Sequence, residues 1–163
     1  MHSNTSFQMP PAARGSVAII ANHRGELLLH LRDDLPTIAW PGHWSLLGGS
    51  AEGNESAAAA IVRELQEEAA LTLDDLTELF TLHDPHNSGK LITFFAGTWD
   101  GDETRLPLAE GAKLQFFPPC HLDSLMIPPL IRDGIHRYLS SQPAGPTDRQ
   151  DTESGPTHLN RAQ

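Results

Sequence analysis

The stretch RELQEEAAL, residues 63–71, places three glutamates within one turn of a predicted helix: Glu64, Glu67 and Glu68. Residues three and four positions apart are neighbours on a helix surface, so Glu64 and Glu68 repel each other by roughly 0.2–0.5 kcal/mol. A helix tolerates this cost when the face is only solvated, with Arg63 and Glu67 forming an i, i+4 ion pair. The other interpretation is that the carboxylates share a cation, because Mg²⁺ takes carboxylate oxygens and keeps water and phosphate as its remaining ligands.

The helix that carries these glutamates is predicted over residues 56–69, with Ser56 as its N-cap. Its apolar residues should form one stripe, centred near Val62 and Leu65, that packs on the core. The members of this stripe are Ala58, Ile61, Val62, Leu65 and Ala69. On an ideal helix the three glutamates lie on a different side, away from the stripe.

Short apolar runs on both sides of this helix predict strands. Residues 16–22 and 26–32 are typical of a β-hairpin with Gly25 in its turn. The remaining expected elements are strands at 76–84, 91–99 and 112–118 and a helix at 130–139. Residues 33–44 contain several turn formers and no period, which predicts a loop. Strands followed by a helix, further strands and a second helix favour an α/β layer fold with a mixed sheet.

The chain has 163 residues, which suits one domain. We expect the folded part over residues 14–140, a flexible N-terminus over 1–13 and a disordered tail over 141–163, because the tail has almost no large apolar residue.

The formal net charge of -10 argues against a nucleic-acid partner, since phosphate backbones are bound by clustered Lys and Arg. The negative charge is still compatible with a phosphorylated small molecule as a partner, because a bound divalent cation reverses the sign of the local electrostatic field. The single cysteine, Cys120, cannot form an internal disulfide and has no activating residue nearby. No apolar run approaches the roughly 20 residues of a membrane span, and the first residues do not resemble a signal peptide. We therefore expect a cytoplasmic protein with no membrane partner.

The segment from Gly49 to Leu71 resembles the signature of the Nudix hydrolases, G-x5-E-x7-R-E-U-x-E-E-x-G-U, where U is a bulky apolar residue. The matching positions are Gly49, Glu55, Arg63, Glu64, Leu65, Glu67, Glu68 and Leu71. Ala70 departs from the pattern, because the family has glycine there. Leu47 is a further departure, because proline commonly stands there, before the two glycines. Without the stiff proline ring the loop is expected to be looser.

The resemblance implies a Nudix-type α/β/α sandwich and hydrolysis of a P–O–P bond with Mg²⁺ or Mn²⁺. It implies that Glu64, Glu67 and Glu68 hold the metal, with a backbone carbonyl of Gly49, and that Gly48 lies at the substrate. The catalytic residues would be Glu64 and Glu67, and Glu64 is the first choice for the general base. Two loop residues, Glu103 and Glu110, are alternative bases or extra metal ligands, and either could equally be a solvated loop charge.

The family's Glu–Arg pair, here Glu55 and Arg63, is implied to be structural, joining the loop to the helix.

Further substrate contacts are suggested by residue type and position. Arg32 ends the second predicted strand, and its guanidinium suits a phosphate, although a surface pair with Asp33 or Asp34 is an equal alternative. Trp40 and His43 precede the signature, where an aromatic ring could stack on a base, whereas Trp44 is expected in the core. The two histidines of the turn His83–His86 could bind a transition metal or touch the substrate, although such a pair is more often part of an ordinary polar turn.

The implied substrate is a small-molecule diphosphate, a nucleotide by preference: an oxidised dGTP, an ordinary nucleoside triphosphate or a nucleotide sugar. Two rival hypotheses remain. One is a Nudix-fold module that binds a nucleotide without turnover, which the intact glutamate set disfavours. The other is the isomerase branch of the family, which needs a reactive cysteine that Cys120 does not supply. Similar proteins commonly dimerise, so a homodimer stays open.

Overall fold

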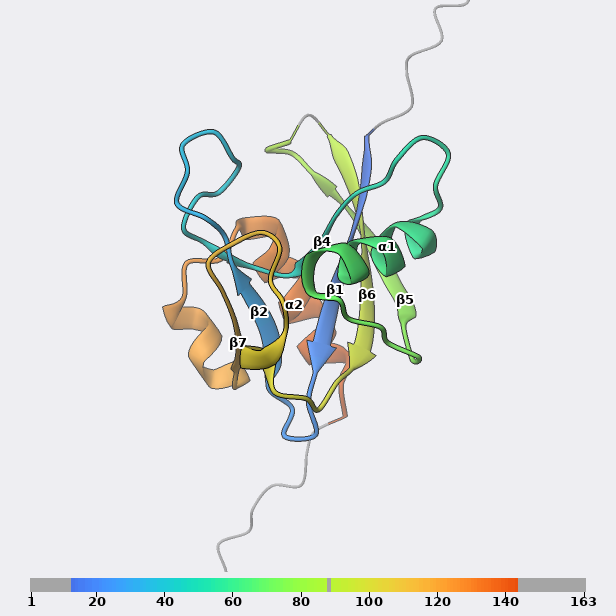
Figure 1. Cartoon of the computed structure of the whole chain (residues 1–163). Helices are drawn as coiled ribbons and strands as arrows, with labels where there is room; N and C mark the ends of the chain where they lie inside the picture. The colour runs from blue at the N-terminus through green and yellow to red at the C-terminus, as the bar shows by residue number, and fades with distance from the viewer. Residues whose placement is uncertain (1–12, 88, 144–163) are drawn as a thin grey trace, which may run out of the picture.

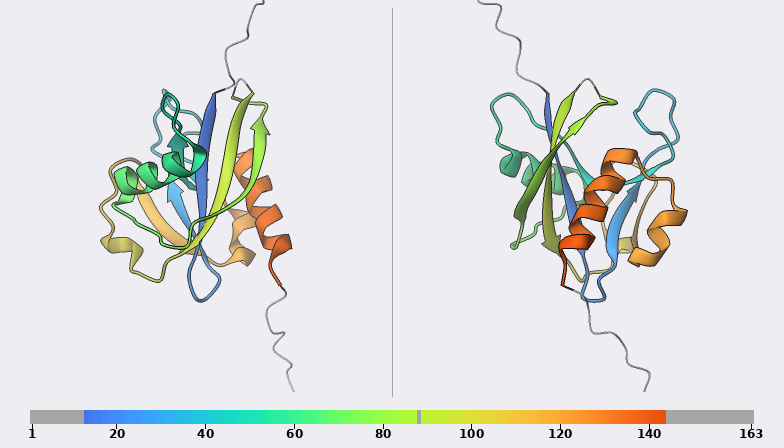
Figure 2. Two further views of the ribbon diagram at one scale, coloured as in Figure 1. Left: turned by 90° about the vertical axis from the view of Figure 1, so that its right-hand side faces the viewer. Right: turned by 180° about the vertical axis from the view of Figure 1, so that it is seen from behind.

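The computed structural model describes residues 13–87 and 89–143, which form a mixed sheet with a helix on each face (Figure 1). The predictions of a flexible start and a disordered tail concern mainly residues 1–12 and 144–163, which lie outside the described residues. The two described helices are α1 (Ala57–Ala69) and α2 (Pro129–Ser141). Figure 2 shows them on opposite faces of the sheet, so the predicted α/β/α sandwich is confirmed.

The sheet is built around β1 (Arg14–Ala21), which pairs in parallel with β6 (Lys90–Thr98) and antiparallel with β2 (Leu27–Leu31) and β4 (Leu47–Ser50). The other strands lie further out and all pair antiparallel: β3 (Trp44–Ser45), β5 (Thr77–Asp84) and β7 (Lys113–Phe117). The predicted hairpin of β1 and β2 is therefore confirmed. Strands β3 and β4 and two short 3₁₀ helices, Glu103–Arg105 and Pro119–Ser124, were not predicted.

Alternating residues of β1 divide the core into two layers, as expected where side chains point to opposite faces of a sheet. Ala18 and Ile20 pack with the buried residues of α1, while Val17 and Ile19 pack on the other face with those of α2. Both faces of β1 are thus buried, which fixes its register against β6 and β4.

The buried face of α1 differs from the predicted stripe. Ile61 and Leu65 are buried, but Val62 is 55% exposed and Glu68 is only 8% exposed. The expectation that all three glutamates lie away from the core was wrong for Glu68. The physical reason is that the helix packs with Ile61, Leu65 and Glu68 toward the sheet, because i, i+4 and i+7 lie on one side of a helix.

Both departures from the signature have a structural account. Ala70 ends α1 in the left-handed conformation, with φ 50° and ψ 36°, where an L-residue is strained relative to glycine. Leu47 does not loosen a loop, which corrects the expectation: it lies in β4, is 1% exposed and packs in the core on the α1 side. Among the described helices, none is long and apolar enough to span a membrane.

Candidate active site

A cleft of about 830 Å³ opens at the end of the sheet where α1 and several loops meet. Its walls come from β4 and α1, from the loop after β2 (residues 32–42), from the turn between β5 and β6, and from the first turn of α2. In Figure 1 the loop after β2 stands at the upper left and α1 at the centre right. Glu64, Glu67 and Glu68 all line this cleft, as do Gly48 and Gly49.

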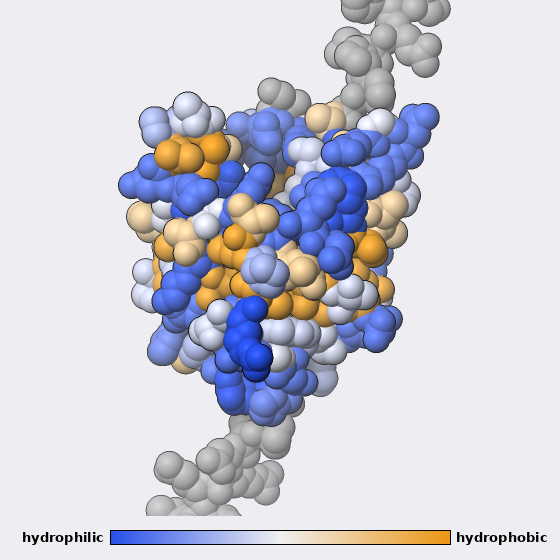
Figure 3. Space-filling model, in the orientation of Figure 1, coloured by the Kyte–Doolittle hydropathy of each residue, from blue (hydrophilic) through white to orange (hydrophobic). Residues whose placement is uncertain are grey.

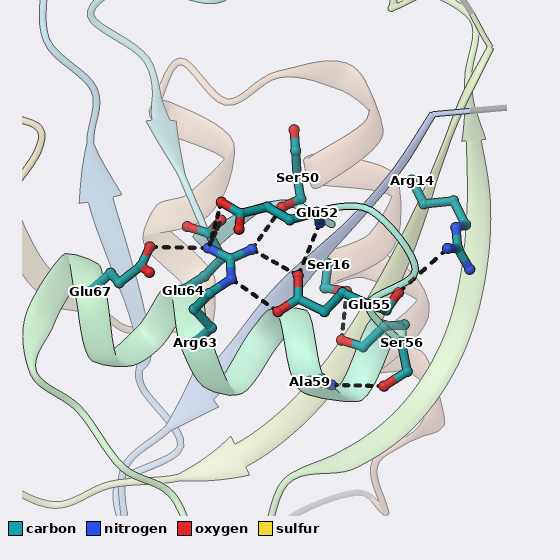
Figure 4. A network of polar contacts seen from close by, with 11 residues as sticks. Arg14, Ser16, Ser50, Glu52, Glu55, Ser56, Ala59, Arg63, Glu64 and Glu67 are labelled. Carbon is teal, nitrogen blue, oxygen red and sulfur yellow. Dashed lines mark hydrogen bonds and ion pairs between the residues drawn. The ribbon is translucent and has the colours of Figure 1, made fainter. Parts of the chain in front are cut away.

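Arg63 organises the acidic wall of the cleft (Figure 4). Its Nε and one terminal nitrogen each donate to a Glu55 carboxylate oxygen at 3.0 Å, which makes a bidentate ion pair. The other terminal nitrogen donates to Glu64 at 2.9 Å and to Glu67 at 3.0 Å. The hydrogen bonds from Arg63 lower the pKa of the Glu55 carboxyl. The guanidinium therefore ties the loop before α1 to the helix and separates the crowded carboxylates.

Glu68 lies deeper than the other two glutamates. The backbone N–H of Gly48 donates to Glu68 Oε2 at 2.9 Å. Burial raises the pKa of Glu68 to about 7, and the nearby charges of Glu64 and Glu110 act in the same direction, while the hydrogen bond from Gly48 opposes them. A carboxylate in this position gains most from a cation, because desolvation disfavours its charged form.

The two glycines of β4 permit the close approach between this strand and its neighbours. Gly48 has φ 141°, and a Cβ there would stand 2.1 Å from the Ser16 carbonyl oxygen. A Cβ on Gly49 would stand 2.5 Å from the carboxyl carbon of Glu64. Any side chain at position 49 would therefore displace the Glu64 carboxylate from the cleft wall.

The donor set of this wall fits a hard divalent cation, since three carboxylates of one helix line a single cleft. In the conformation seen here, no three His, Cys, Asp or Glu side chains within residues 13–87 and 89–143 are gathered closely enough to hold a metal ion. The hydrogen bonds from Arg63 to Glu64 and Glu67, and from Gly48 to Glu68, account for this spacing.

The two loop glutamates are placed differently. Glu110 lines the cleft, and its charge is among those that act on Glu68. Glu103 lies in a separate shallow pocket with Asn22 and Asp100, and its carboxylate accepts a hydrogen bond from the Phe116 backbone at 3.4 Å. The structure therefore brings only Glu110 to the predicted site.

Glu110 is carried by a firmly anchored segment of backbone. The N–H of Ala109 donates to the Glu68 carbonyl at 2.8 Å, and Gly111 N–H donates to Asp33 Oδ2 at 3.1 Å. The buried ring of His30 pairs through Nε2 with the Glu110 carbonyl at 2.9 Å, so Nε2 carries the proton in this contact. Burial lowers the pKa of His30. These contacts hold Glu110 beside the end of α1.

Only some of the residues suggested as substrate contacts line the cleft. Arg32 lines the cleft; its Nε donates to the Ala39 carbonyl at 2.8 Å, and its terminal nitrogens donate no hydrogen bond to the described residues. Trp40 and His86 line the cleft, whereas His83 does not. Trp44 packs edge-on against Phe117 with ring centroids 4.7 Å apart, which confirms its predicted place in the core.

Lys90 is a cleft residue that was not predicted from the sequence. Lys90 begins β6, lines the cleft, and donates from Nζ to Ser50 Oγ at 2.6 Å. It forms no ion pair with another described residue. No motif in the sequence marks this lysine; only the pairing of β6 with β1 brings it beside the loop after β4.

Comparisons with known proteins agree with this geometry. The family model described as "NUDIX domain" matches residues 11–138. A protein of Bacillus subtilis (strain 168) named "Putative 8-oxo-dGTP diphosphatase" is 29% identical over 115 residues, which cover 71% of this chain and 72% of that protein.

Two solved structures show the same fold. The NUDIX domain of Shewanella oneidensis NrtR, solved in complex with ADP ribose, has a TM-score of 0.68 at 15% identity, covering 81% of this chain and 89% of that one. The MutT protein of Methanosarcina mazei Go1 has a TM-score of 0.66 at 23% identity, covering 82% and 96%.

Proposed function

Because this chain belongs to the Nudix family, we propose that it is a metal-dependent pyrophosphohydrolase that cleaves a nucleoside triphosphate or a nucleoside diphosphate linked to another group. The observation that carries the proposal is the single cleft lined by Glu64, Glu67 and Glu68 together with the cations Arg32 and Lys90. A diphosphate requires a divalent cation, which the carboxylates can share, and basic groups that face it. The names of the similar proteins, an 8-oxo-dGTP diphosphatase and a domain that binds ADP ribose, support a nucleotide as the substrate.

In this proposal Glu64, Glu67 and Glu68 hold Mg²⁺ or Mn²⁺, with the backbone carbonyl of Gly49 as a further ligand. When bound, the cation neutralises charge that develops on the phosphate oxygens. Gly48, whose N–H orients Glu68, lies at the substrate side of the same wall. Arg63 and Glu55 keep the carboxylates in place and do not touch the substrate.

Hydrolysis forms a bond from a water oxygen to phosphorus and breaks the bond from phosphorus to the bridging oxygen, while a base takes the water proton. Glu64 is our first candidate for this base, because it lies at the cleft wall and is only 15% exposed. Glu110 is the second candidate, held over the same cleft by its anchored backbone. Arg32 and Lys90 suit the negative charge of the phosphates through their free N–H groups.

The test is Mg²⁺-dependent hydrolysis of a panel of canonical and oxidised dNTPs, nucleotide sugars, ADP-ribose, dinucleoside polyphosphates and prenyl diphosphates. Glu67→Gln should lower the turnover of the best substrate by about 10²-fold or more, because it removes a carboxylate from the metal site. Glu78→Gln is the matched control, since Glu78 is an exposed glutamate of β5 outside the cleft. If no compound were hydrolysed while a nucleotide still raised the melting temperature, the chain would be a nucleotide-binding module instead. The homodimer and the cytoplasmic location stay predictions.

A further inference from the structure

The wall of the cleft formed by the loop after β2 is apolar, in contrast to the acidic wall formed by α1. Leu35, Ile38 and Trp40 from this loop line the cleft, and Leu130 and Ile131 line it from the start of α2. Leu35 is 50% exposed, which is unusual for a large apolar side chain in this protein. Figure 3 shows a hydrophobic patch at the upper left, over the position of this loop in Figure 1.

Trp40 is held in a strained conformation within that wall. Its φ of 55° is in the left-handed region, which an aromatic L-residue adopts only when its surroundings impose it. Gly42 N–H donates to the Asp33 carbonyl at 3.1 Å and closes the loop at its base. The Arg32 side chain holds the Ala39 carbonyl, directly before Trp40, at 2.8 Å. The loop therefore fixes the backbone that presents this indole.

The Trp40 ring also joins two loops that are remote in the sequence. It contacts His43 edge-on, with centroids 5.4 Å apart at 63°, and His86 of the β5–β6 turn, with centroids 6.0 Å apart at 86°. The half-buried indole thus contacts both histidines while still lining the cleft. A supported aromatic ring at a cleft wall is a stacking platform, since flat π-systems stack with little dependence on the exact ring.

We propose that Trp40 stacks on the heteroaromatic base of the substrate, so that the base lies on the wall of the loop after β2 and the phosphates lie toward α1. This inference rests on the proposed function. Polar side chains that line the same cleft, including His86 in contact with Trp40 and its neighbour Asn87, favour a base over an aliphatic chain, because a base has hydrogen-bonding edges that these groups satisfy. Arg32 begins the loop after β2 and lines the same cleft, and its terminal nitrogens donate no hydrogen bond to the described residues.

The experiment uses the emission of Trp40 in the full chain with Mg²⁺ present. The chain has two other tryptophans: Trp44 packs in the core, and Trp99 stacks on Phe116 outside the cleft. GMP should quench the emission of the wild type and of Trp99→Phe, whereas ribose 5-phosphate, which has no base, should not. Equal quenching by ribose 5-phosphate, or no quenching by GMP, would overturn the proposal.

Calorimetric titration with GMP then separates stacking from simple apolar contact. Trp40→Phe keeps an aromatic ring and should bind GMP within about threefold of the wild type. Trp40→Leu keeps an apolar side chain without the ring and should bind GMP about 5- to 150-fold more weakly, the range that stacking of one base corresponds to. Unchanged GMP affinity in Trp40→Leu, with the melting temperature confirming a folded variant, would contradict the proposal.

The outcomes distinguish this inference from the proposed function. If members of the diphosphate panel were hydrolysed but Trp40 did not respond to GMP, the proposed activity would be supported and the stacking role of Trp40 would be contradicted. Quenching by GMP without hydrolysis of any panel member would retain the stacking role and remove the proposed activity.

Discussion

The backbone N–H of Gly48 donates to the Glu68 carboxylate at 2.9 Å. Among the described residues, this is the one hydrogen bond to the Glu68 side chain, which is only 8% exposed. One hydrogen bond does not offset the desolvation of a carboxylate, so burial raises the pKa of Glu68 to about 7. Glu68 thus destabilises the folded chain when it is ionised without a cation. The buried position of Glu68 therefore favours the binding of a cation over the stability of the folded chain.

Glu68→Gln is predicted to stabilise the protein without divalent metal at alkaline pH. Between pH 4.5 and about 7 the folded chain keeps a proton that the unfolded chain has lost, so the free energy of unfolding falls as pH rises, and the full loss is present above pH 7. A shift of this size corresponds to roughly 3 kcal/mol at most. Thermal unfolding in EDTA should show a higher melting temperature for the variant near pH 8 and little difference near pH 4.5. A variant less stable than the wild type near pH 8, with Glu78→Gln unchanged, would contradict the assignment.

The affinity for Mg²⁺ is predicted to rise with pH up to about 7. Metal ligands must be deprotonated, and a proton on Glu68 competes with the cation below its pKa. For one competing proton the affinity falls by about tenfold for each pH unit below that value. Isothermal titration with Mg²⁺ between pH 5.5 and 8 measures this slope in the wild type. In Glu68→Gln the affinity should be weaker and should lose most of the slope; an unchanged slope would mean that another group competes.

The anchored segment around Glu110 predicts a coupling between Asp33 and Glu110. If Glu110 is the base, Glu110→Gln should lower kcat by about 10²- to 10⁴-fold. Asp33→Ala removes the hydrogen bond to Gly111 N–H and should lower kcat by about 3- to 10-fold with KM little changed. The double variant should be no slower than Glu110→Gln alone, because both changes act through the same carboxylate. Asp34→Ala is the matched control, and a kcat for Glu110→Gln within about threefold of the wild type would leave Glu64 as the base.

Ala70→Gly is predicted to stabilise the protein by about 0.5–1 kcal/mol, because glycine adopts the left-handed conformation of this residue without strain. Ala70 does not line the cleft, so hydrolysis should be unaffected. Ala69→Gly is the control at the preceding position: Ala69 is helical and fully buried, so glycine there should destabilise. Chemical denaturation of the three proteins gives the comparison. A loss of stability in Ala70→Gly would show that the strain of the positive φ is smaller than the entropy that glycine loses on folding.

The sequence alone determined the features that depend on spacing within one element. The helix period places Glu64, Glu67 and Glu68 within one turn, and the signature adds Glu55 and Arg63, which the structure joins by a bidentate ion pair. Alternating and periodic apolar runs also predicted five of the seven described strands and both described α-helices in their order, but not β3 and β4. These features are accessible from sequence because the backbone geometry of a single helix or hairpin relates nearby residues directly.

Only the tertiary structure decided which residues from remote segments meet at the cleft. The parallel pairing of β1 with β6 brings Lys90 to the site, and the anchoring of Gly111 to Asp33 brings Glu110 there while Glu103 stays outside. The rotation of α1 on the sheet buried Glu68 and exposed Val62 against the predicted stripe. Loop positions follow from packing and sheet register, which have no period in the sequence, and the face that a helix buries depends on the surface it meets.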